Sequence, residues 1–319
     1  MVVTWTEAVV VSHTPATPDI AVIDLAPGEG AEFPAYTAGA HVDVLTASGL
    51  VRQYSLCGPP ETGRYRLAVL NEPQSRGGSR EMHALRVSDR LRISAPRNRF
   101  PLVTAQRHLL FAGGIGITPI LAMLRQLEYE GGDFTLHYCA RSRDRAAFVT
   151  ELQGNPRVAL HFDDEEPGQR LDVARDLGDP RPDTAVYVCG PGGFMDHVLG
   201  EAEALGWPPQ SLHKERFAKQ DPAGAPDTAG SDGGFTVRLA STGAEYAVPE
   251  GRGVLDVLLE NGIDTPYSCQ LGICGECVVK VLAGDPDHRD DVLTDGERAE
   301  GMFAICTSRA TTPVLELDL

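Results

Sequence analysis

Four cysteines near the C-terminal end of the sequence have the spacing of an iron–sulfur site. Cys269, Cys274 and Cys277 stand in the order C-x4-C-x2-C, and 28 residues separate Cys277 from Cys306. This is the plant-type spacing for a [2Fe-2S] cluster, in which four thiolates bind two irons. We therefore predict that these four cysteines are metal ligands.

A zinc site and a disulfide are the alternatives for these cysteines. Four-cysteine zinc sites normally use two C-x2-C pairs, and the wider first gap and the distant fourth cysteine fit that arrangement poorly. A disulfide needs an oxidising compartment, whereas the N-terminal residues contain no basic leader followed by an apolar segment, which predicts a cytoplasmic protein. Gly272 and Gly275 would let the loop approach a cluster without a Cβ in the way. The pattern favours the cluster.

A glycine-rich turn joins an apolar strand to a helix in "LLFAGGIGITPILAML". Gly113, Gly114 and Gly116 precede Thr118 and Pro119, which open the helix. Glycine permits close backbone approach, proline suits a first helical turn, and a helix N-terminus attracts a pyrophosphate. The turn therefore predicts a phosphate site, although it is not the G-x-G-x-x-G dinucleotide fingerprint and close packing is the alternative explanation.

A second strand ends in small residues at "YVCGPGGFM". Here Cys189, Gly190, Pro191 and Gly192 precede another helix. Two strand ends that expose their backbone can border one crevice, which is where ligands bind in open α/β sheets. Taken alone, Cys189 is equally explained as a small buried residue.

The segment "VRQYSL" places an arginine, a tyrosine and a serine on one predicted strand. Arg52 and Tyr54 share a face by the two-residue period, and Ser55 follows at the strand edge. A guanidinium binds phosphate, and an aromatic ring can stack on a flat heterocycle. The alternative is an ordinary amphipathic strand.

The segment "RGGSREMH" supplies a second candidate anion site. Gly77, Gly78 and Ser79 offer N–H groups and a hydroxyl just before a helical run. The alternative role for Ser79 is that of a helix N-cap.

Strand and helix patterns divide the chain into three folded regions and a linker. Residues 1–103 carry short β-type runs separated by Gly and Pro, which predict an antiparallel β-barrel interrupted by one helix. Residues 104–219 alternate apolar strands with helical patterns, which is typical of an α/β, doubly wound sheet. Residues 220–234 are rich in Pro, Gly, Ala and Asp and predict a flexible linker. Residues 235–319 are predicted to form an α+β domain around the cysteine loop.

Composition argues against two kinds of partner. A net charge of -17 would repel nucleic acid, and no apolar run approaches the ~20 residues of a membrane span. Residues 235–319 hold 15 acidic and 6 basic side chains, a net charge of -9. This excess predicts a partner with a positively charged docking face. We expect a monomer.

In this order, the segments resemble the phthalate dioxygenase reductase family. The resemblance covers essentially the whole chain and rests on "RQYSL", "RGGS", "PRNRFPL", "AGGIGITP", "YVCGPGGFM", "HKERF" and "CQLGICGEC" with its later cysteine. It implies an FMN-binding barrel, an NAD-binding α/β domain and a plant-type ferredoxin domain of β-grasp fold. It also implies an oxidoreductase that passes electrons from NADH to FMN, then to the [2Fe-2S] cluster, and finally to a terminal oxygenase.

The resemblance also implies roles for residues at the flavin. Arg52 and Ser79 would hold the flavin phosphate, Tyr54 would lie against the isoalloxazine ring, and Ser55 would form a hydrogen bond near N5. The implied flavin site further includes Gln53, Val69, Gly77, Gly78, Glu215 and Phe217.

For the pyridine nucleotide, the resemblance implies contacts at both strand ends. Gly114 and Thr118 would touch the nucleotide, and Cys189 would border the nicotinamide. The implied nucleotide site further includes Gly113, Gly116, Arg141, Gly190, Pro191 and Gly192. Ser55, Thr118 and Cys189 are the residues expected beside the reacting atoms.

Two cofactor choices depend on particular segments. Between "LNEPQS" and the GGS turn there is no aromatic-bearing loop for an adenosine, which favours FMN over FAD. The resemblance implies NADH, whereas Arg141, Ser142 and Arg143 after "TLHYCA" could bind the 2′-phosphate of NADPH, and "HFDDEE" (161–166) places acid after the next strand. NADPH therefore stays open.

The expected partner is a terminal oxygenase. By resemblance, Rieske-type aromatic-ring oxygenases or demethylases are the first candidates, and cytochrome P450 monooxygenases are the second. A redox-sensing module and a zinc-stapled flavin reductase are the alternatives from other functional classes.

Overall fold

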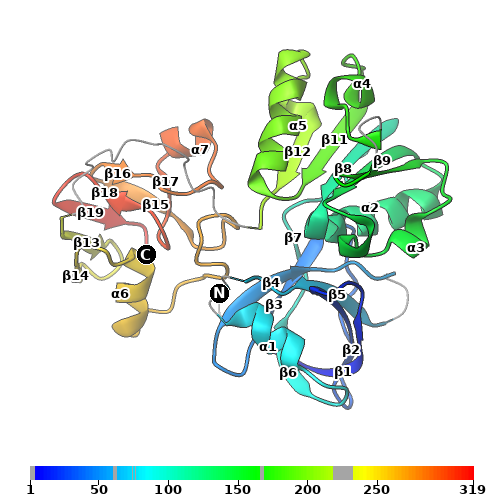
Figure 1. The fold of residues 1–319 in the computed structure, drawn as a ribbon. Helices are drawn as coiled ribbons and strands as arrows, with labels where there is room; N and C mark the ends of the chain where they lie inside the picture. The colour runs from blue at the N-terminus through cyan, green and yellow to red at the C-terminus, as the bar shows by residue number, and fades with distance from the viewer. Residues whose placement is uncertain (1–3, 60–62, 74, 76, 166–168, 218–232) are drawn as a thin grey trace. The chain divides into compact units, whose positions relative to one another are not determined.

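The computed structural model describes residues 4–59, 63–73, 75, 77–165, 169–217 and 233–319 (Figure 1). These residues form two compact units, one spanning Thr4–Phe217 and the other containing the described residues from 233 onward. The predicted linker, 220–234, lies outside the described residues except for its last two positions. Within the described ranges, no helix is both long enough and apolar enough to cross a membrane.

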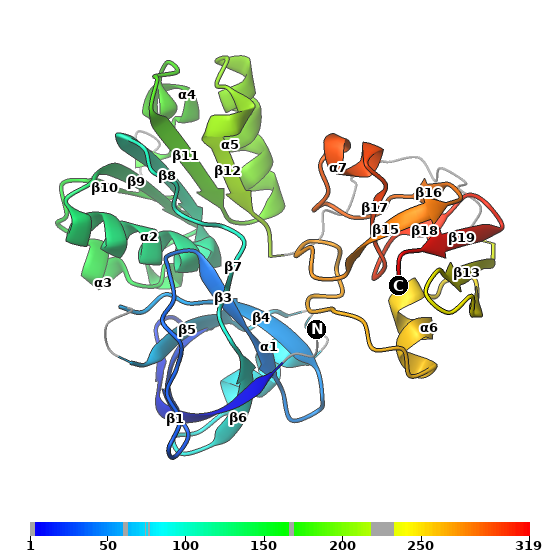
Figure 2. The same ribbon diagram turned by 180° about the vertical axis from the view of Figure 1, so that it is seen from behind.

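The first part of the larger unit is a curled antiparallel sheet. Its strands are β1 (Trp5–Pro15), β2 (Ile20–Pro27), β3 (Ala40–Leu45), β4 (Val51–Ser55), β5 (Tyr65–Leu70), β6 (Arg90–Ser94) and β7 (Arg97–Asn98). They pair in the order β4-β3-β6-β1-β2-β5, with β7 beside β3. Because the two end strands, β4 and β5, also approach one another, the sheet forms the expected barrel (Figure 2).

Alternating side chains fill the barrel. Val42 and Val44 of β3 are fully buried with Ile23, Leu25 and Leu67 in one apolar cluster. Helix α1 (Gly78–Ala84) adds Met82 to this cluster, so the helix is held by its apolar face although it has only seven residues.

The second part of the larger unit is a five-stranded parallel sheet in the order β10-β9-β8-β11-β12. Its elements are β8 (Arg107–Gly113), α2 (Ile117–Glu130), β9 (Asp133–Ala140), α3 (Val149–Leu152), β10 (Val158–Phe162), α4 (Val173–Leu177), β11 (Thr184–Cys189), α5 (Gly192–Ala204) and β12 (Leu212–Glu215). Three-residue turns of 3-10 helix occur at Gly114–Gly116, Arg143–Arg145 and Pro209–Ser211. The strand order reverses between β8 and β11, the two neighbouring strands that carry the glycine turns.

Helices cover both faces of this sheet. Leu110, Leu136 and Tyr138 face α2 and α3, whereas Leu109 and Phe111 face α4 and α5. The α2 face is continuous with the barrel, since Ile20, Ala38 and Phe100 belong to the same apolar cluster. The barrel and the parallel sheet therefore share one core.

Polar contacts add to the joint between barrel and sheet. Arg145 forms a 2.7 Å ion pair with Asp19, and the Ala38 N–H donates to Gln126 Oε1 at 3.3 Å. The buried Tyr187 hydroxyl donates to the Pro101 carbonyl at 3.0 Å. These bonds link α2, the turn at Arg143–Arg145 and β11 to the barrel and to the segment that follows it.

The smaller unit combines a mixed sheet with one main helix. Its elements are β13 (Phe235–Leu239), β14 (Glu245–Val248), α6 (Val254–Glu260), β15 (Val278–Ala283), β16 (Pro286–Asp287), α7 (Asp295–Ala299), β17 (Met302–Ala304), β18 (Arg309–Ala310) and β19 (Val314–Leu317). The sheet order is β14-β13-β19-β15-β17, with β13 and β19 parallel. Leu255 and Leu258 of α6 pack on Val237, Leu315 and Leu317. This is the α+β arrangement expected for the last domain.

The alternative role that the sequence suggested for Ser79, a helix N-cap, is wrong. Ser79 is not the N-cap of α1, because Gly77 occupies that position and no side chain caps the helix there. Ser79 lies inside the first turn, and its hydroxyl accepts a hydrogen bond from the Glu72 N–H at 3.2 Å.

Candidate functional site

The four predicted metal ligands lie together around the loop between α6 and β15. Cys269, Cys274 and Cys277 are buried, and Cys306, just after β17, is partly buried. The thiols lie in two neighbouring pairs, Cys269 with Cys274 and Cys277 with Cys306. The fold thus brings together residues separated by up to 37 positions.

The pairing is that of a two-metal site. A single tetrahedral zinc ion would place all four sulfurs within about 4 Å of one another, because Zn–S bonds are about 2.3 Å long. Among the described residues, no group of three or more ligand atoms lying within 4.8 Å of one another includes these cysteines. Two separate thiol pairs therefore fit two irons better than one zinc ion.

Backbone N–H groups stabilise negative charge on the sulfurs. Hydrogen bonds from the Cys274 thiol and from the Ile273 and Leu271 N–H groups lower the pKa of Cys269 to about 6. The Leu271 N–H lies 3.3 Å from the Cys269 Sγ. Such a loop suits ligation by thiolates.

Gly272 is required by the loop itself. Its φ of +73° is left-handed, and a Cβ there would lie 2.5 Å from Thr307 Oγ1 and 3.1 Å from the Asp290 Cα. The Gly272 N–H in turn lowers the pKa of Cys306, after the larger effect of the Cys277 thiol. The residues present therefore fit a [2Fe-2S] cluster.

In the larger unit, the predicted flavin residues of β4 point to two faces. Arg52 and Tyr54 lie on the face of α1, where burial raises the pKa of Tyr54 to about 12. Gln53 and Ser55 lie on the other face, beside their register partners Asp43 and His41. Ser55 is buried, with 6% of its surface exposed.

The GGS turn lies against the side chain of Arg52. A Cβ at Gly78 would be 2.6 Å from the Arg52 Cγ and 2.8 Å from its Nε, so only glycine leaves room for the guanidinium beside the first turn of α1. Gly77 has φ +117°, which also requires glycine. A cation beside uncapped N–H groups is a suitable place for a phosphate.

Val69 is a backbone anchor rather than an exposed contact. It is buried, and its carbonyl accepts a 2.8 Å hydrogen bond from the Nε2 of His83, on α1. This bond holds α1 against β5.

A buried polar network beside Ser55 was missed by the residue-by-residue sequence analysis. Asp43 is fully buried and forms an ion pair with Arg97, and the Gln53 amide contacts His41 at 3.2 Å. The sequence feature that could have revealed this network is the segment "PRNRFPL", which contains Arg97. The network holds β3, β4 and β7 together on the Ser55 face.

The two glycine turns of the parallel sheet touch each other. A Cβ at Gly116 would lie 2.3 Å from the Cys189 carbonyl oxygen, and one at Gly190 would lie 2.9 Å from the Gly113 Cα. Close packing therefore explains Gly113, Gly116 and Gly190. Gly114 differs, because it has φ +52° and a Cβ there would meet nothing within 4 Å. It borders open space at the carboxyl edge of the sheet.

The other predicted nucleotide-binding residues of this edge differ in their exposure and in their partners. Thr118 is buried and its hydroxyl donates to the Ile115 carbonyl at 3.1 Å. Arg141 is exposed after β9, whereas Arg143 pairs with Glu165 at 3.5 Å. Glu166, the last residue of the acidic segment, lies outside the described residues. Pro191 and Gly192 are exposed at the start of α5.

Cys189, which is buried, and Glu215, which is partly buried, lie side by side at the ends of β11 and β12. They are register partners, and burial raises the pKa of the Cys189 thiol, so it is not a thiolate at neutral pH. Burial raises the pKa of Glu215 to about 8, and its Oε2 has no hydrogen-bond partner among the described residues. A buried carboxyl oxygen without a partner is available to accept a hydrogen bond from a polar cofactor or to donate one to it. Phe217, two residues later, is 39% exposed.

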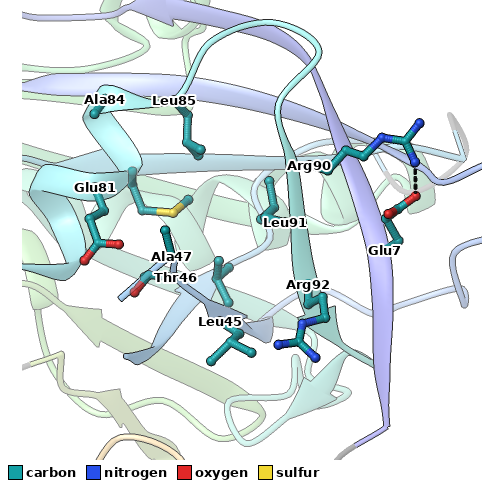
Figure 3. A pocket seen from close by; sticks show the side chains of 12 residues that line it. Glu7, Leu45, Thr46, Ala47, Glu81, Ala84, Leu85, Arg90, Leu91 and Arg92 are labelled. Carbon is teal, nitrogen blue, oxygen red and sulfur yellow. Dashed lines mark hydrogen bonds and ion pairs between the residues drawn. The ribbon is translucent and has the colours of Figure 1, made fainter. Parts of the chain in front are cut away.

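A cavity of about 520 Å³ lies beside α1, between it and β6 (Figure 3). Leu45, Met82, Leu85 and Leu91 line it, and the 2.6 Å ion pair of Arg90 with Glu7 lies at its edge. None of the predicted flavin or nucleotide residues lines this cavity. It is therefore separate from the cofactor positions inferred from the sequence.

Comparisons with known proteins agree with this arrangement along the whole chain. Residues 237–311 match the family model of the 2Fe-2S iron-sulfur cluster binding domain. The chain is 50% identical over 321 residues to a vanillate O-demethylase oxidoreductase of Pseudomonas putida, covering 98% of this chain and 99% of that protein.

Two solved structures are similar over 99% of the chain. The structure of phthalate dioxygenase reductase is 35% identical, with a TM-score of 0.75 and 98% of its own length covered. An intact type IV self-sufficient cytochrome P450 monooxygenase is 38% identical with a TM-score of 0.84, but the match covers 41% of that chain. The chain thus spans less than half of the second protein.

Proposed function

Because the chain belongs to the phthalate dioxygenase reductase family, an oxygenase-reductase family that uses FMN, NADH and a [2Fe-2S] cluster, we propose that it supplies electrons to a Rieske-type aromatic O-demethylase. The observation that carries this proposal is the 50% identity to a vanillate O-demethylase oxidoreductase over nearly the full length of both chains. We further propose domains at 1–103, 104–219 and 235–319, a cytoplasmic location and a monomeric state.

When bound, FMN would supply two-electron chemistry by accepting one hydride from NADH, and the cluster would accept the electrons one at a time. The chain supplies binding sites and their electrostatics. Arg52 with the turn at Gly78 and Ser79 would hold the FMN phosphate. Tyr54 would lie against the isoalloxazine ring, and Ser55 would form a hydrogen bond near N5. The fit between Arg52 and Gly78 supports this placement.

At the carboxyl edge of the parallel sheet, Gly114 and Cys189 would border the nicotinamide, and Glu215 and Phe217 would close the flavin site. The open space beside Gly114 leaves the backbone accessible there. Burial raises the pKa of Glu215 to about 8, which favours the uncharged form of its carboxyl near neutral pH. We propose NADH as the donor. Arg141 is exposed directly after β9, where a 2′-phosphate could bind, whereas Arg143 pairs with Glu165. The rates of flavin reduction by NADH and by NADPH should therefore be compared.

In the smaller unit, Cys269 and Cys274 would hold one iron, and Cys277 and Cys306 the other. The two thiol pairs support this assignment. The N–H groups that point at Cys269 and Cys306 would favour the thiolate form of these ligands.

A cytochrome P450 is the second candidate partner, because a self-sufficient P450 monooxygenase contains a region similar to the entire chain. The sensing and zinc alternatives have no comparable support, since the family and the thiol pairs both indicate a cluster for electron transfer.

The test compares partners directly. The purified holoprotein is mixed with NADH and either a vanillate-demethylating oxygenase component or a P450 that lacks a reductase domain, and substrate conversion is measured. The proposal expects faster conversion by the Rieske-type oxygenase. Rapid NADH-dependent reduction of cytochrome c without conversion by that oxygenase would contradict the proposed partner while leaving the reductase chemistry intact.

A further inference from the structure

A second group of metal-ligand side chains lies in the larger unit. Among the described residues, His137, His161 and Asp176 place one ligand atom each within 4.8 Å of the others. The His137 Nδ1 lies 3.1 Å from the His161 Nε2 and 3.8 Å from the Asp176 Oδ2. Both imidazoles are more than nine-tenths buried, and the Asp176 side chain is 11% exposed.

The strand register brings these residues to one face. His137 on β9 pairs with Phe111 on β8, and His161 on β10 pairs with Cys139 on β9. Because alternate residues share a face, His137, Cys139 and His161 all lie on the side covered by α4, which carries Asp176. Leu109 and Phe111 of β8 on this face belong to an apolar cluster with Val173 and Leu177 of α4, whereas Arg107 and Thr135 on the same face contact each other at 3.5 Å.

A cluster of two histidines and an aspartate is unusual on a buried face of a parallel sheet. Both faces of a parallel sheet are normally filled by Val, Ile and Leu, and buried polar groups are unfavourable unless they are paired. On this face, His137 stacks on Phe111 with ring centroids 5.1 Å apart and on His161 with centroids 5.3 Å apart. The stacking orients both rings so that their nitrogens converge with the carboxylate.

The hydrogen bonds of His161 leave one nitrogen for a metal. Its Nδ1 lies 2.8 Å from the Gln169 carbonyl oxygen. A carbonyl only accepts, so Nδ1 carries the proton and Nε2 presents its lone pair toward His137. Metal-bound imidazoles commonly donate their second N–H to a backbone carbonyl in this way.

His137 is able to take the same role. Burial lowers its pKa to about 4, so the ring is neutral at pH 7. Without a metal, its Nδ1–H donates to the His161 Nε2. With a metal, the proton would sit on the Nε2 of His137 instead, and its Nδ1 would become a ligand. No net proton is released by this change of tautomer.

Asp176 supplies the one negative charge among the three ligands, and the positive charge of Arg175 lies beside it. Asp176 accepts hydrogen bonds from Arg175 at 2.7 and 2.8 Å, and from the Asp172 N–H at 3.2 Å, which orient its carboxylate. The field of Asp163 and Asp176 also reaches Cys139, whose pKa is raised to about 12, chiefly by burial. Cys139 is outside the 4.8 Å group, so its thiol is not counted among the ligands.

We propose that His137, His161 and Asp176 bind one zinc-class divalent ion, with water in the fourth position. Two ligands of a tetrahedral zinc ion lie about 3.3 Å apart, because Zn–N and Zn–O bonds are about 2.0–2.2 Å long. The 3.1 and 3.8 Å separations lie on either side of this value. Imidazole ligands favour zinc over calcium or magnesium. The ion would fasten α4 to β9 and β10 and is independent of the oxygenase partner.

The test is zinc binding by the full-length holoprotein. After treatment with a chelator, Zn²⁺ is titrated by calorimetry, and the metal content per chain is measured together with the Zn K-edge EXAFS spectrum. We expect one zinc per chain in addition to iron, with N/O ligands at about 2.0–2.1 Å. No binding at about 100 μM Zn²⁺, well above the dissociation constants of structural zinc sites, or a shell of sulfur at about 2.3 Å, would overturn the proposal, since sulfur would place the zinc at the cysteine loop.

Three variants locate the site. His161→Gln and Asp176→Asn should each weaken zinc binding at least about 10- to 100-fold, whereas His197→Gln, on the exposed surface of α5, should bind as wild type. If His161→Gln fails to fold, Asp176→Asn decides, because its carboxamide has the shape of the carboxylate. Wild-type zinc affinity in Asp176→Asn would overturn the proposal.

Discussion

Replacing Gly116 by alanine tests how the two glycine turns form the nucleotide edge. The new Cβ would lie 2.3 Å from the carbonyl oxygen, 2.4 Å from the carbonyl carbon of Cys189, and 2.6 Å from the Gly190 nitrogen. These are backbone atoms of another strand end, so no side chain can rotate away. The turns must separate.

The expected cost of Gly116→Ala follows from this overlap. Overpacking in a well-packed core lowers the free energy of unfolding by about 1–3 kcal/mol. For a unit of this size, each kcal/mol lowers the Tm by about 2–4 °C, so we expect a decrease of about 2–12 °C. Because the turns border the proposed nicotinamide position, the KM for NADH should also rise.

Gly193→Ala is the matched control. A Cβ at Gly193 meets nothing within 4 Å, its φ is not left-handed, and it lies in the first turn of α5. This variant should be unchanged or slightly more stable, by up to about 1 kcal/mol. The assays are thermal unfolding of the larger unit, followed by flavin fluorescence, and steady-state NADH oxidation with cytochrome c. A Gly116→Ala protein with the Tm and KM of Gly193→Ala would refute the reasoning.

Three further predictions concern the flavin, a buried carboxyl and the partner. Ser55→Ala should slow NADH-dependent flavin bleaching about tenfold, the effect of losing one hydrogen bond of about 1.4 kcal/mol, and an unchanged stopped-flow rate would exclude the role near N5. Glu215 has a folded-state pKa of about 8, above its ordinary 4.5. Its contribution to the free energy of unfolding should therefore be complete below pH 4.5 and lost as the pH rises through 8, a change of at most about 5 kcal/mol. Glu215→Gln should flatten the stability profile between those values, and a profile identical to wild type in urea unfolding would contradict the raised pKa. Reduction of the oxygenase should slow about tenfold or more between 0.01 and 0.15 M salt, where the Debye length falls from about 30 to about 8 Å, and a salt-independent rate would exclude electrostatic steering.

The sequence predicted what depends on local pattern. The spacing of Cys269, Cys274, Cys277 and Cys306 defines a loop motif, and the order of motifs led to the family that the comparisons show. Period-two runs located the barrel strands, such as β2, whose bounds match the segment "IAVIDLAP". These features are encoded by neighbouring residues.

Features that depend on contacts between distant segments were not predictable in the same way. Packing of Gly116 against Cys189 joins two turns more than 70 residues apart, so the sequence alone left open whether the glycines served packing or a ligand. The hydroxyl of Thr118 was expected at the nucleotide, but the structure shows it bonded to Ile115. Its contact with a nucleotide remains a prediction.

Short elements and buried polar groups also escaped the sequence patterns. The helix α4 has five residues and β12 has four, too few for a clear hydrophobic period. His137 and His161 stand in runs that predict ordinary buried strands, and nothing in either run indicates that the two rings meet. Only the parallel register of β9 and β10 brings them together.

The central claim is that electrons from NADH leave the chain through the cysteine loop to a terminal oxygenase. Cys306→Ala tests it most directly, because it removes one iron ligand in the smaller unit and leaves the flavin and nucleotide residues untouched. With NADH, the wild-type protein should drive vanillate conversion by the oxygenase component. The variant should reduce ferricyanide from NADH at the wild-type rate yet give no conversion. Vanillate conversion by the variant at the wild-type rate would contradict the claim.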